Sequence, residues 1–599
     1  MLRLAVAQLK PFKGEYQRNL ARLGELLRSF AGDPEPPDLL VLPETALTGY
    51  FVEGAVRELA RSAEDFYADL ARLHEASGGP PLDIVIGFYE MWRTRLHNSA
   101  LAASLGGPDA GIRHVHRKIF LPTYGVFDEE RFVEPGRSVR AFDTRWGRAA
   151  VIVCEDAWHS LIPTIAALDG AQLLLIVSAS PARGLAPEEG GEERPASLLR
   201  WERTIQAIAG EHGIYAALAQ LVGFEGGKAF PGGSLVIGPR GDVLARARIF
   251  EEDVLRVTVE LDEIPRVRAD MPLLSDLEMR LPHLFDELAG NRRSESRDGN
   301  GRPLDPAVQP SSRPAVRSPQ PSRLGSRNDP LAIDPELTRR WLVEFLKDEV
   351  GRRRGFTRAV VGLSGGVDSA VVAHLAAEAL GAENVTALRM PYHASSPHSL
   401  EHAALVIEAL GLRAETIDIS AAADGLASSL GDRPDPARLG NICARLRMTA
   451  LFDRSAALSA LPLGTGNKTE RLFGYFTWHA DDTPPVNPIG DLFKSQVWAL
   501  ARHLGVPEEI VKKAPTADLI QGQTDEDDLG ISYAKADAIL HWLLMGYPAD
   551  AIAAAGYSAG EVELVRGRLD STHWKRKLPT VAMVSQTAIG EYYLRPVDY

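Results

Sequence analysis

One segment near the middle of the chain cannot belong to a hydrophobic core. Residues 289–330 are rich in Arg, Ser, Pro and Gly and contain almost no large apolar side chains. Such a segment buries too little surface to offset the entropy lost on ordering. We interpret it as an interdomain linker, long and at least partly flexible. It divides the 599-residue chain into a first domain over residues 1–288 and a second over residues 331–599.

The overall composition excludes several classes of protein. Apolar residues make up 45% of the chain and charged residues 24%, which is typical of a soluble globular protein. The net charge of −14 argues against nucleic-acid partners and anionic membranes. We find no signal peptide and no apolar run of about 20 residues. The two cysteines, Cys154 and Cys443, exclude a disulfide scaffold and fit a reducing cytoplasm, where we expect the protein.

The first half alternates strand-like and helix-like segments and predicts an α/β domain with helices on the outer side of a sheet. Helices are expected over residues 15–30 and 197–213. Apolar runs bounded by Gly, Pro or Asp indicate the strands. These runs are LRLAVAQL, DLLVLPE, DIVIGFYE, NSALAASL, AAVIVCED, QLLLIVSAS, IYAALAQLV, SLVIGP and VLRVTVEL.

The second half begins with an amphipathic helix over residues 335–353. A strand, a glycine loop and a helix follow over residues 357–381, and the further strands NVTALRM, AETIDI and LPLGTGN are separated by helical segments. This order predicts a doubly wound parallel sheet, whose ligand binds at the carboxyl ends of the strands.

The glycine loop reads SGGVDS, from Ser364 to Ser369. Gly365 and Gly366 permit a tight turn, and their N–H groups with the helix N-terminus form an anion site. The loop lacks the lysine of a Walker A motif. It is therefore suited to holding a departing pyrophosphate during attack on the α-phosphate of ATP, with Asp368 helping to hold Mg²⁺.

SGGVDS resembles the signature of the ATP pyrophosphatases, and the motifs after it are similar to those of one member, the NAD synthetases. Residues 441–448 resemble the NxxARxRM helix of that family, and LGTGNKTE over residues 463–470 resembles its GTGNKSE segment. Similar motifs occur at residues 474–477, 487–494, 514–519 and 523–526. The resemblance implies an adenine nucleotide alpha-hydrolase-like fold for the second domain.

The resemblance also implies the residues of the second site. It places ATP at Gly362, Leu363, Ser364, Gly365, Gly366, Val367, Asp368, Ser369 and Thr465. It places deamido-NAD at Asn441, Arg445, Glu470, Tyr475, Trp478, Lys494 and Lys575. Asp368 and Glu470 are expected to hold Mg²⁺. The turn Trp478–Asp481 departs from the family pattern but keeps a carboxylate at Asp481.

Three segments of the first half each place one reactive side chain at or just beyond the end of an apolar strand. They lie at residues 42–44, 117–122 and 151–158 and carry Glu44, Lys118 and Cys154. A cysteine nucleophile needs a base and a cation that stabilises the developing oxyanion. Glu44 is expected to be the base and Lys118 the cation, without the histidine of a papain-type site.

The order Glu–Lys–Cys resembles the nitrilase, or carbon–nitrogen hydrolase, superfamily, which implies an α-β-β-α sandwich. Residues 121–132 resemble the form of this domain that is fused to NAD synthetases. The resemblance implies that Tyr124 lines a glutamine pocket and that Glu129 is a supporting acidic residue. Ser180 is also expected to bind glutamine, and either Arg183 or Arg194 its carboxylate.

Together the halves predict an enzyme that hydrolyses L-glutamine through a thioester on Cys154. The released ammonia then amidates the adenylated nicotinate carboxylate of deamido-NAD, and NAD⁺, AMP and pyrophosphate are formed. The resemblance implies a homo-oligomer with a dimeric synthetase core, often an octamer in bacteria. Two alternatives stay open: an ammonia-dependent synthetase with a structural nitrilase-like domain, and another amidotransferase of the ATP-pyrophosphatase type.

Overall fold

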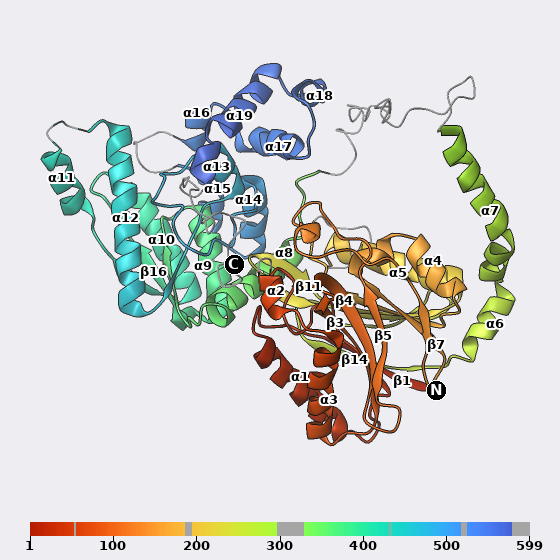
Figure 1. The fold of residues 1–599 in the computed structure, drawn as a ribbon. Helices are drawn as coiled ribbons and strands as arrows, with labels where there is room; N and C mark the ends of the chain where they lie inside the picture. Colours follow the sequence, from red (N-terminus) through yellow and green to blue (C-terminus); the bar gives the residue numbers. More distant parts are fainter. Residues whose placement is uncertain are drawn as a thin grey trace. The chain divides into compact units, whose positions relative to one another are not determined.

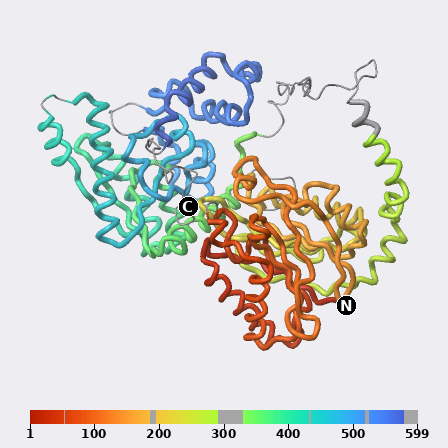
Figure 2. Tube along the Cα trace, viewed as in Figure 1, coloured from red at the N-terminus to blue at the C-terminus, as the bar shows by residue number. Residues whose placement is uncertain are grey.

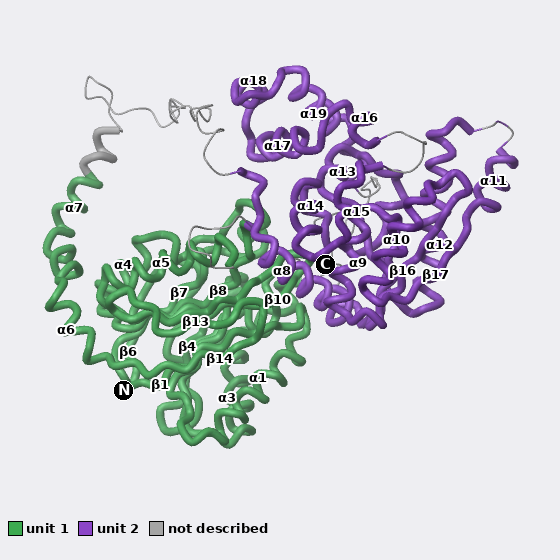
Figure 3. The backbone as a smooth tube through the Cα atoms, turned by 180° about the vertical axis from the view of Figure 1, so that it is seen from behind, with its two compact units in different colours: residues 1–184, 194–312, 581–599 green, residues 185–193, 313–580 purple. Residues whose placement is uncertain are grey.

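The computed structural model forms two compact units (Figure 3). Figure 2 follows the chain through the first unit in red to yellow-green and through the second in green to blue. The structure describes residues 1–52, 55–185, 194–295, 329–430, 432, 434–516 and 524–577. Most of the predicted linker lies outside these residues, and the helix before it continues to Glu295, so the domain boundaries stay a prediction. Across the described part of the chain, none of the helices is both long and apolar enough to cross a membrane.

The first unit contains two mixed β-sheets, drawn in Figure 1. One has the strand order β14-β1-β2-β3-β4-β5 and the other β13-β12-β9-β8-β7-β6, beside a hairpin of β10 and β11. The strands are β1 (Leu2–Gln8), β2 (Leu39–Val41), β3 (Leu82–Trp92), β4 (Arg95–Leu105), β5 (Gly111–Arg117), β6 (Ala141–Asp143), β7 (Arg148–Val153), β8 (Leu173–Ser178), β9 (Tyr215–Gln220), β10 (Val222–Glu225), β11 (Lys228–Pro231), β12 (Leu235–Ile237), β13 (Val243–Arg246) and β14 (Asp253–Val259).

Helices cover the outer faces of these sheets. α1 and α3 pack on the first sheet, and α4 and α5 on the second. The helices are α1 (Tyr16–Ala31), α2 (Val56–Leu59), α3 (Ala63–Ser77), α4 (Leu161–Leu168), α5 (Ala196–His212), α6 (Glu263–Asp270) and α7 (Leu273–Glu295). α1 buries Leu20, Leu23 and Leu27 at helical spacing, which forms one apolar stripe against the sheet.

Strand β1 shows how the core is divided. Leu4 and Val6 belong to the core between the two sheets, whereas Ala5 and Ala7 belong to the core under α1 and α3. Successive side chains of a strand point to opposite faces, so a continuous apolar run serves both cores. The predicted α-β-β-α sandwich is confirmed.

The second unit is built on a parallel sheet with the strand order β17-β16-β15-β18. Its strands are β15 (Ala359–Gly362), β16 (Val385–Arg389), β17 (Arg413–Thr416) and β18 (Leu461–Leu463). The chain proceeds from β15 outward to β17 and then returns to β18 on the other side of β15. The carboxyl end of β15 is therefore a topological switch point, where open α/β sheets bind ligands.

Helices cover both faces of this sheet. Ala359 and Val361 face the core shared with α8, α9 and α14, whereas Val360 packs with Leu451 of α12. The helices are α8 (Pro335–Leu346), α9 (Val367–Leu380), α10 (Pro397–Leu410), α11 (Ser420–Ser429), α12 (Pro436–Leu458), α13 (Lys468–Phe473), α14 (Lys494–His503), α15 (Glu508–Lys512), α16 (Asp525–Leu529), α17 (Tyr533–Leu544), α18 (Ala549–Ala554) and α19 (Ala559–Ser571). The predicted doubly wound sheet is confirmed.

Gly87 in β3 allows the chain after β2 to approach the sheet. A Cβ atom at this position would lie 2.4 Å from the Cα of Glu44 and 2.7 Å from the backbone nitrogen of Thr45. No side-chain rotation relieves such a contact, because both atoms belong to the main chain. The lack of a side chain at Gly87 therefore allows the backbone of Glu44 to lie directly against β3.

We predict that Gly87→Ala destabilises the first unit by about 1–3 kcal/mol, since overpacking against backbone forces main-chain shifts. Gly32→Ala is the matched control, because a Cβ there meets nothing within 4 Å. It should change the free energy of unfolding by less than about 0.5 kcal/mol. Urea unfolding followed by the fluorescence of the first unit measures both; equal midpoints for the two variants would contradict the prediction.

Candidate functional sites

Cys154 lies immediately after β7 and begins a short 3-10 turn, Cys154–Trp158. Its φ angle of 44° is in the left-handed region, which a residue with a side chain rarely adopts. Such strain occurs where the surrounding structure imposes it, often at functional sites. The thiol is buried, and the hydroxyl of Ser178 donates a hydrogen bond to Sγ at 3.3 Å.

Lys118 connects the predicted base to a second carboxylate. Its Nζ donates to Oε1 of Glu44 at 2.9 Å and to Oε2 of Glu129 at 2.6 Å. Lys118 and Glu44 are fully buried, and Glu129 is nearly so. The three residues predicted as catalytic thus lie in one cluster with Glu129, which sequence reasoning placed only as a supporting acidic residue.

Asn98 is a member of this cluster that the sequence analysis missed. Its amide nitrogen donates to Oε1 of Glu44 at 2.7 Å and also to Glu129. The backbone N–H of Ala179 donates to the other oxygen of Glu44 at 2.7 Å. The only sequence signal for Asn98 is an amide at the start of an otherwise apolar strand. Its role follows from the pairing of β4 with its neighbours, which the sequence does not state.

The electrostatics of the cluster keep the resting thiol neutral. Burial raises the pKa of the Cys154 thiol, and the carboxylate of Glu44 raises it further, whereas the ammonium of Lys118 lowers it. Burial also raises the pKa of Glu44. For Lys118 burial lowers the pKa, but Glu129 and Glu44 outweigh burial, so the net pKa is raised and the amine stays charged.

The remaining residues predicted to bind glutamine lie in two loops of the first unit. Tyr124 is exposed, and its hydroxyl donates to Glu155 at 2.8 Å. Arg183 is exposed and stacks over Phe127, which belongs to the same loop as Tyr124. Ser180 accepts a hydrogen bond from the indole of Trp201 at 2.9 Å.

Arg194 is the alternative to Arg183 for the glutamine carboxylate. Its guanidinium donates to Glu202 at 2.9 Å, and Arg246 contacts the same carboxylate. Arg183 faces the Tyr124 loop, whereas Arg194 neutralises an acidic residue of α5. The geometry favours Arg183 of the two, and both assignments stay predictions.

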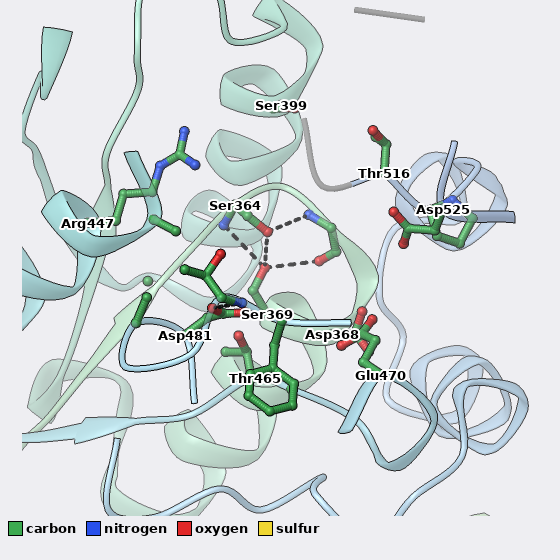
Figure 4. Close-up of a pocket in the computed structure, with 18 of the residues that line it drawn as sticks. Ser364, Asp368, Ser369, Ser399, Arg447, Thr465, Glu470, Asp481, Thr516 and Asp525 are labelled. Carbon is green, nitrogen blue, oxygen red and sulfur yellow. Dashed lines mark hydrogen bonds between the residues drawn. The ribbon is translucent and has the colours of Figure 1, made fainter. Parts of the chain in front are cut away.

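The second unit contains a cavity of roughly 660 Å³. Figure 4 shows the cavity with its lining side chains around the SGGVDS loop. Most residues predicted to bind ATP or deamido-NAD line it, namely Gly362, Leu363, Ser364, Gly366, Val367, Asp368, Ser369, Thr465, Glu470, Tyr475, Lys494 and Lys575. Gly365, Asn441, Arg445 and Trp478 are not among its described lining residues.

Two serines close the SGGVDS loop on itself. The hydroxyls of Ser364 and Ser369 are 3.1 Å apart, and the Ser369 hydroxyl donates to the carbonyl of Gly366 at 3.1 Å (Figure 4). The backbone N–H of Ser364 donates to Ser369 at 3.3 Å. The loop is thus held in a fixed shape at the N-terminus of α9, where backbone N–H groups attract an anion.

Gly365 serves a different purpose from its neighbours. Its φ angle is +77°, and a Cβ atom would lie 2.1 Å from the carbonyl oxygen of Ser399. The glycine is therefore required by the backbone conformation and by the approach of α10. This explains why Gly365 belongs to the motif although it does not line the cavity.

Asp368 and Glu470 point toward one another in the cavity, as Figure 4 shows. The ammonium of Lys494 lies against both, contacting Asp368 and donating to Oε1 of Glu470 at 3.2 Å. Burial raises the pKa of Glu470 to about 7; Lys494 opposes this shift, and the negative charge of Asp368 adds to it. Lys494, predicted to contact deamido-NAD, is therefore also the charge partner of the two carboxylates.

The donor set at this point fits a hard divalent cation. Asp368 and Glu470 supply oxygen ligands. The ammonium of Lys494 contacts both carboxylates, which shows that the position attracts positive charge. Within the described ranges, no group of three or more His, Cys, Asp or Glu side chains could hold a metal ion. Mg²⁺ commonly binds through one or two carboxylates together with substrate phosphates.

Helix α12 presents Arg447 to the cavity. Arg447 lines it with Ala444 and Met448, and its Nε donates to the carbonyl of Met390 at 3.0 Å. Arg445 instead donates to the carbonyl of Trp478 at 3.2 Å. Sequence reasoning missed Arg447, although residues 443, 447 and 451 follow one helical face.

Residues 474–477 form one wall of the site. Thr477 lines the cavity and donates through its hydroxyl to Asn441 at 3.0 Å. Lys575 donates to the carbonyls of Gly474 and Phe476 at 2.8 and 2.9 Å. Asn441 and Lys575 thus hold the wall, and their predicted contacts with deamido-NAD stay predictions.

Comparisons with known proteins assign a family to each half of the chain. The carbon–nitrogen hydrolase family model matches residues 3–269, and the NAD synthase family model matches residues 338–579. A glutamine-dependent NAD⁺ synthetase from Acinetobacter baumannii, solved in complex with adenosine diphosphate, shares the fold. Its TM-score is 0.67 over 98% of this chain and 96% of that one, at 23% identity. The protein is thus a carbon–nitrogen hydrolase joined to an NAD synthase.

Two curated relatives narrow the family to which the whole chain is assigned. A glutamine-dependent NAD(+) synthetase from Thermotoga maritima is 30% identical over 613 residues, covering 100% of this chain and 98% of that protein. An NH(3)-dependent NAD(+) synthetase from Chlorobaculum parvum is 47% identical over 263 residues, covering 43% of this chain and 94% of that protein. The chain belongs to the glutamine-dependent NAD(+) synthetases, as its motifs predicted.

We predict that Glu44→Gln accelerates alkylation of the resting Cys154 thiol by iodoacetamide while it abolishes glutamine hydrolysis. The Glu44 carboxylate raises the pKa of this thiol, so its removal should lower that pKa, while Lys118 and Ser178 still stabilise the thiolate. Mass spectrometry of the alkylated peptide at fixed pH gives the rate, and Cys443 in the same chain is the internal control. Slower alkylation of Cys154 in the variant would contradict the prediction.

Gly365→Ala should reduce ammonium-driven NAD⁺ formation by about 100-fold or more, because the loop must shift away from Ser399 and misplace its N–H groups. Gly425→Ala, whose added Cβ meets nothing within 4 Å, should leave the rate unchanged. Steady-state assays with saturating ammonium compare the two variants. Normal turnover by Gly365→Ala would show that the loop conformation is not required.

Proposed function

We propose that the protein makes NAD⁺ from deamido-NAD and ATP, with nitrogen that it releases from L-glutamine at Cys154. The observation that carries this proposal is the buried cluster in which Lys118 contacts Glu44 beside the strained turn of Cys154. A synthetase using only free ammonia has no need to bury two charged groups beside a thiol, because burial of charge is costly.

Hydrolysis of glutamine begins with proton transfer from the Cys154 thiol to Glu44. The sulfur attacks the side-chain amide carbon of glutamine, and the ammonium of Lys118 stabilises the oxyanion that forms. Glu44 returns the proton to the leaving nitrogen, so ammonia departs and a γ-glutamyl thioester remains. Glu44 then takes a proton from water, which attacks the thioester and releases glutamate; the Cys154 sulfur leaves as a thiolate, and Glu44 returns the proton to it. Glu129 and Asn98 hold Lys118 and Glu44 in place.

Amide formation takes place in the cavity of the second unit. The nicotinate carboxylate of deamido-NAD attacks the α-phosphorus of ATP, and pyrophosphate leaves toward the N–H groups of the SGGVDS loop. Ammonia then attacks the acyl adenylate, and AMP departs. Arg447 and Lys494 supply positive charge along the cavity wall.

Asp368 and Glu470 are the residues that would hold Mg²⁺. A cation bound there neutralises charge on the departing pyrophosphate. Lys494 contacts both carboxylates and so offsets part of their negative charge in this structure.

We also propose that the protein assembles as a homo-oligomer. Large apolar side chains are exposed on α4 and α7, including Leu161 at 69% and Phe285 at 62% exposure. Exposed apolar side chains grouped in this way mark interaction surfaces. Sedimentation velocity tests the proposal; a single monomeric species across the micromolar range would contradict it.

The two alternative functions differ from this proposal in their nitrogen source or their acceptor. A structural nitrilase-like domain would leave the Glu44, Lys118 and Cys154 cluster without a reaction. An amidotransferase for another acceptor would show turnover with a different nucleotide or a tRNA and none with deamido-NAD. Product analysis with deamido-NAD and each rival acceptor distinguishes these cases.

Cys154→Ala should abolish glutamine-driven NAD⁺ formation and leave ammonium-driven formation within about twofold, because only the thiol of the first unit is removed. The chain supplies its own control, since Cys443 is also buried but lies on α12. Cys443→Ala should retain both activities to a large degree. Equal loss of both activities in Cys154→Ala would show that Cys154 has a structural role.

A further inference from the structure

The carboxylate of Asp156 receives four hydrogen bonds although no solvent reaches it. Oδ1 accepts from the backbone N–H groups of Ile119 and Phe120, both at 3.0 Å. Oδ2 accepts from the backbone N–H of Val153 at 3.2 Å and lies 2.8 Å from Nε2 of His116. Asp156 and His116 are both buried. A carboxylate accepts but does not donate, so Nε2 of His116 is the donor in this contact.

These four donors belong to the two chain segments that carry the reactive groups. Ile119 and Phe120 directly follow Lys118, and His116 lies two residues before it. Val153 directly precedes Cys154 and is the last residue of β7. One side chain therefore ties the segment of the oxyanion-stabilising amine to the turn of the nucleophile.

The turn needs such a restraint, because Cys154 has a φ angle of 44°. A strained backbone of this kind persists only when neighbouring contacts hold it. Asp156 is positioned within the same 3-10 turn, two residues after the thiol, so its bonds act directly on the strained peptide.

We propose that Asp156 is a positioning residue for glutamine hydrolysis. It fixes the position of the Cys154 thiol relative to Nζ of Lys118. His116 in turn orients the Asp156 carboxylate through its hydrogen bond. The inference rests on the glutamine hydrolysis proposed above. It concerns geometry alone, since Asp156 is turned toward the backbone and toward His116.

Asp156→Asn tests the proposal at almost constant shape. An amide has one acceptor oxygen, and its other end is an NH₂ donor. In either orientation the NH₂ group faces two of the N–H groups that the carboxylate now satisfies. The substitution therefore removes two of the four hydrogen bonds without removing volume.

Asp169→Asn is the matched control. Asp169 also caps a backbone N–H, that of Ala141 at 2.8 Å, and pairs with Arg148. These contacts join the end of α4 to β6 and to the first residue of β7, and they touch neither the Lys118 segment nor the Cys154 turn. Asp169→Asn should change stability while leaving glutamine turnover intact.

The experiment measures kcat and KM for glutamate release, ammonium-driven NAD⁺ formation, and hydrogen exchange of the β8 amides. For Asp156→Asn we expect kcat with glutamine to fall by about 100-fold, since small misplacements of reacting groups have effects of this size. KM for glutamine should change less than about threefold, and ammonium-driven synthesis should be unchanged. Protection of β8 should persist, which shows that the first unit is folded.

A second variant, His116→Phe, removes one of the four hydrogen bonds and keeps a planar ring. It should lower kcat in the same direction but less than Asp156→Asn. Glutamine turnover within threefold of wild type in both variants would overturn the inference. So would loss of β8 protection in both, since Asp156 would then be needed for folding. Failure of the wild-type protein to hydrolyse glutamine would refute the proposed function instead.

Discussion

A buried lysine held between two carboxylates is the feature on which each site depends. In the first unit Lys118 contacts Glu44 and Glu129, and in the second Lys494 contacts Asp368 and Glu470. A lone charge in such a position is strongly disfavoured, and loss of one partner commonly costs about 3–5 kcal/mol. The rest of each site is arranged so that these charges are paired and hydrogen-bonded.

The two units bring these charged groups together from different kinds of element. In the first unit the charged groups come from loops that follow β2 and β5, and Gly87 lets the Glu44 segment approach closely. In the second unit they come from the N-terminal ends of α9, α13 and α14 around the switch point of a parallel sheet. The charged groups thus lie at the ends of strands in the first unit and of helices in the second, and these rigid elements fix their separation.

Much of this arrangement could be predicted from the sequence, for identifiable physical reasons. Continuous apolar runs predicted the main strands, and the order of strands and helices in the second half predicted a doubly wound sheet with its ligand at the carboxyl ends of the strands. The strand β5 was missed because GIRHVHR has only two large apolar residues, Ile112 and Val115, whose spacing of three does not fit the period of two of a strand. The short strands β6, β10, β11 and β13 were also missed, since three or four residues give no reliable period.

Many residues of the candidate sites could be named from the sequence, but the contacts between them could not be predicted. Glu44 and Cys154 could be named because each follows an apolar strand, and Lys118 because the order Glu–Lys–Cys resembles a known family. Asn98 joins them only through the pairing of strands distant in sequence. Arg447 was not considered beside Arg445, because a motif does not state which side of a helix faces the ligand. The pairing of Lys494 with Asp368 spans separate elements and carries no local sequence signal.

The central claim is that nitrogen released in the first unit is the nitrogen of the product. Glutamine labelled with ¹⁵N in its side-chain amide, supplied with unlabelled ammonium in the medium, tests this claim directly. Mass spectrometry of the NAD⁺ carboxamide should then show ¹⁵N in proportion to the glutamate released. NAD⁺ that carries the unlabelled nitrogen of the medium, while glutamine is hydrolysed at the same time, would contradict the account.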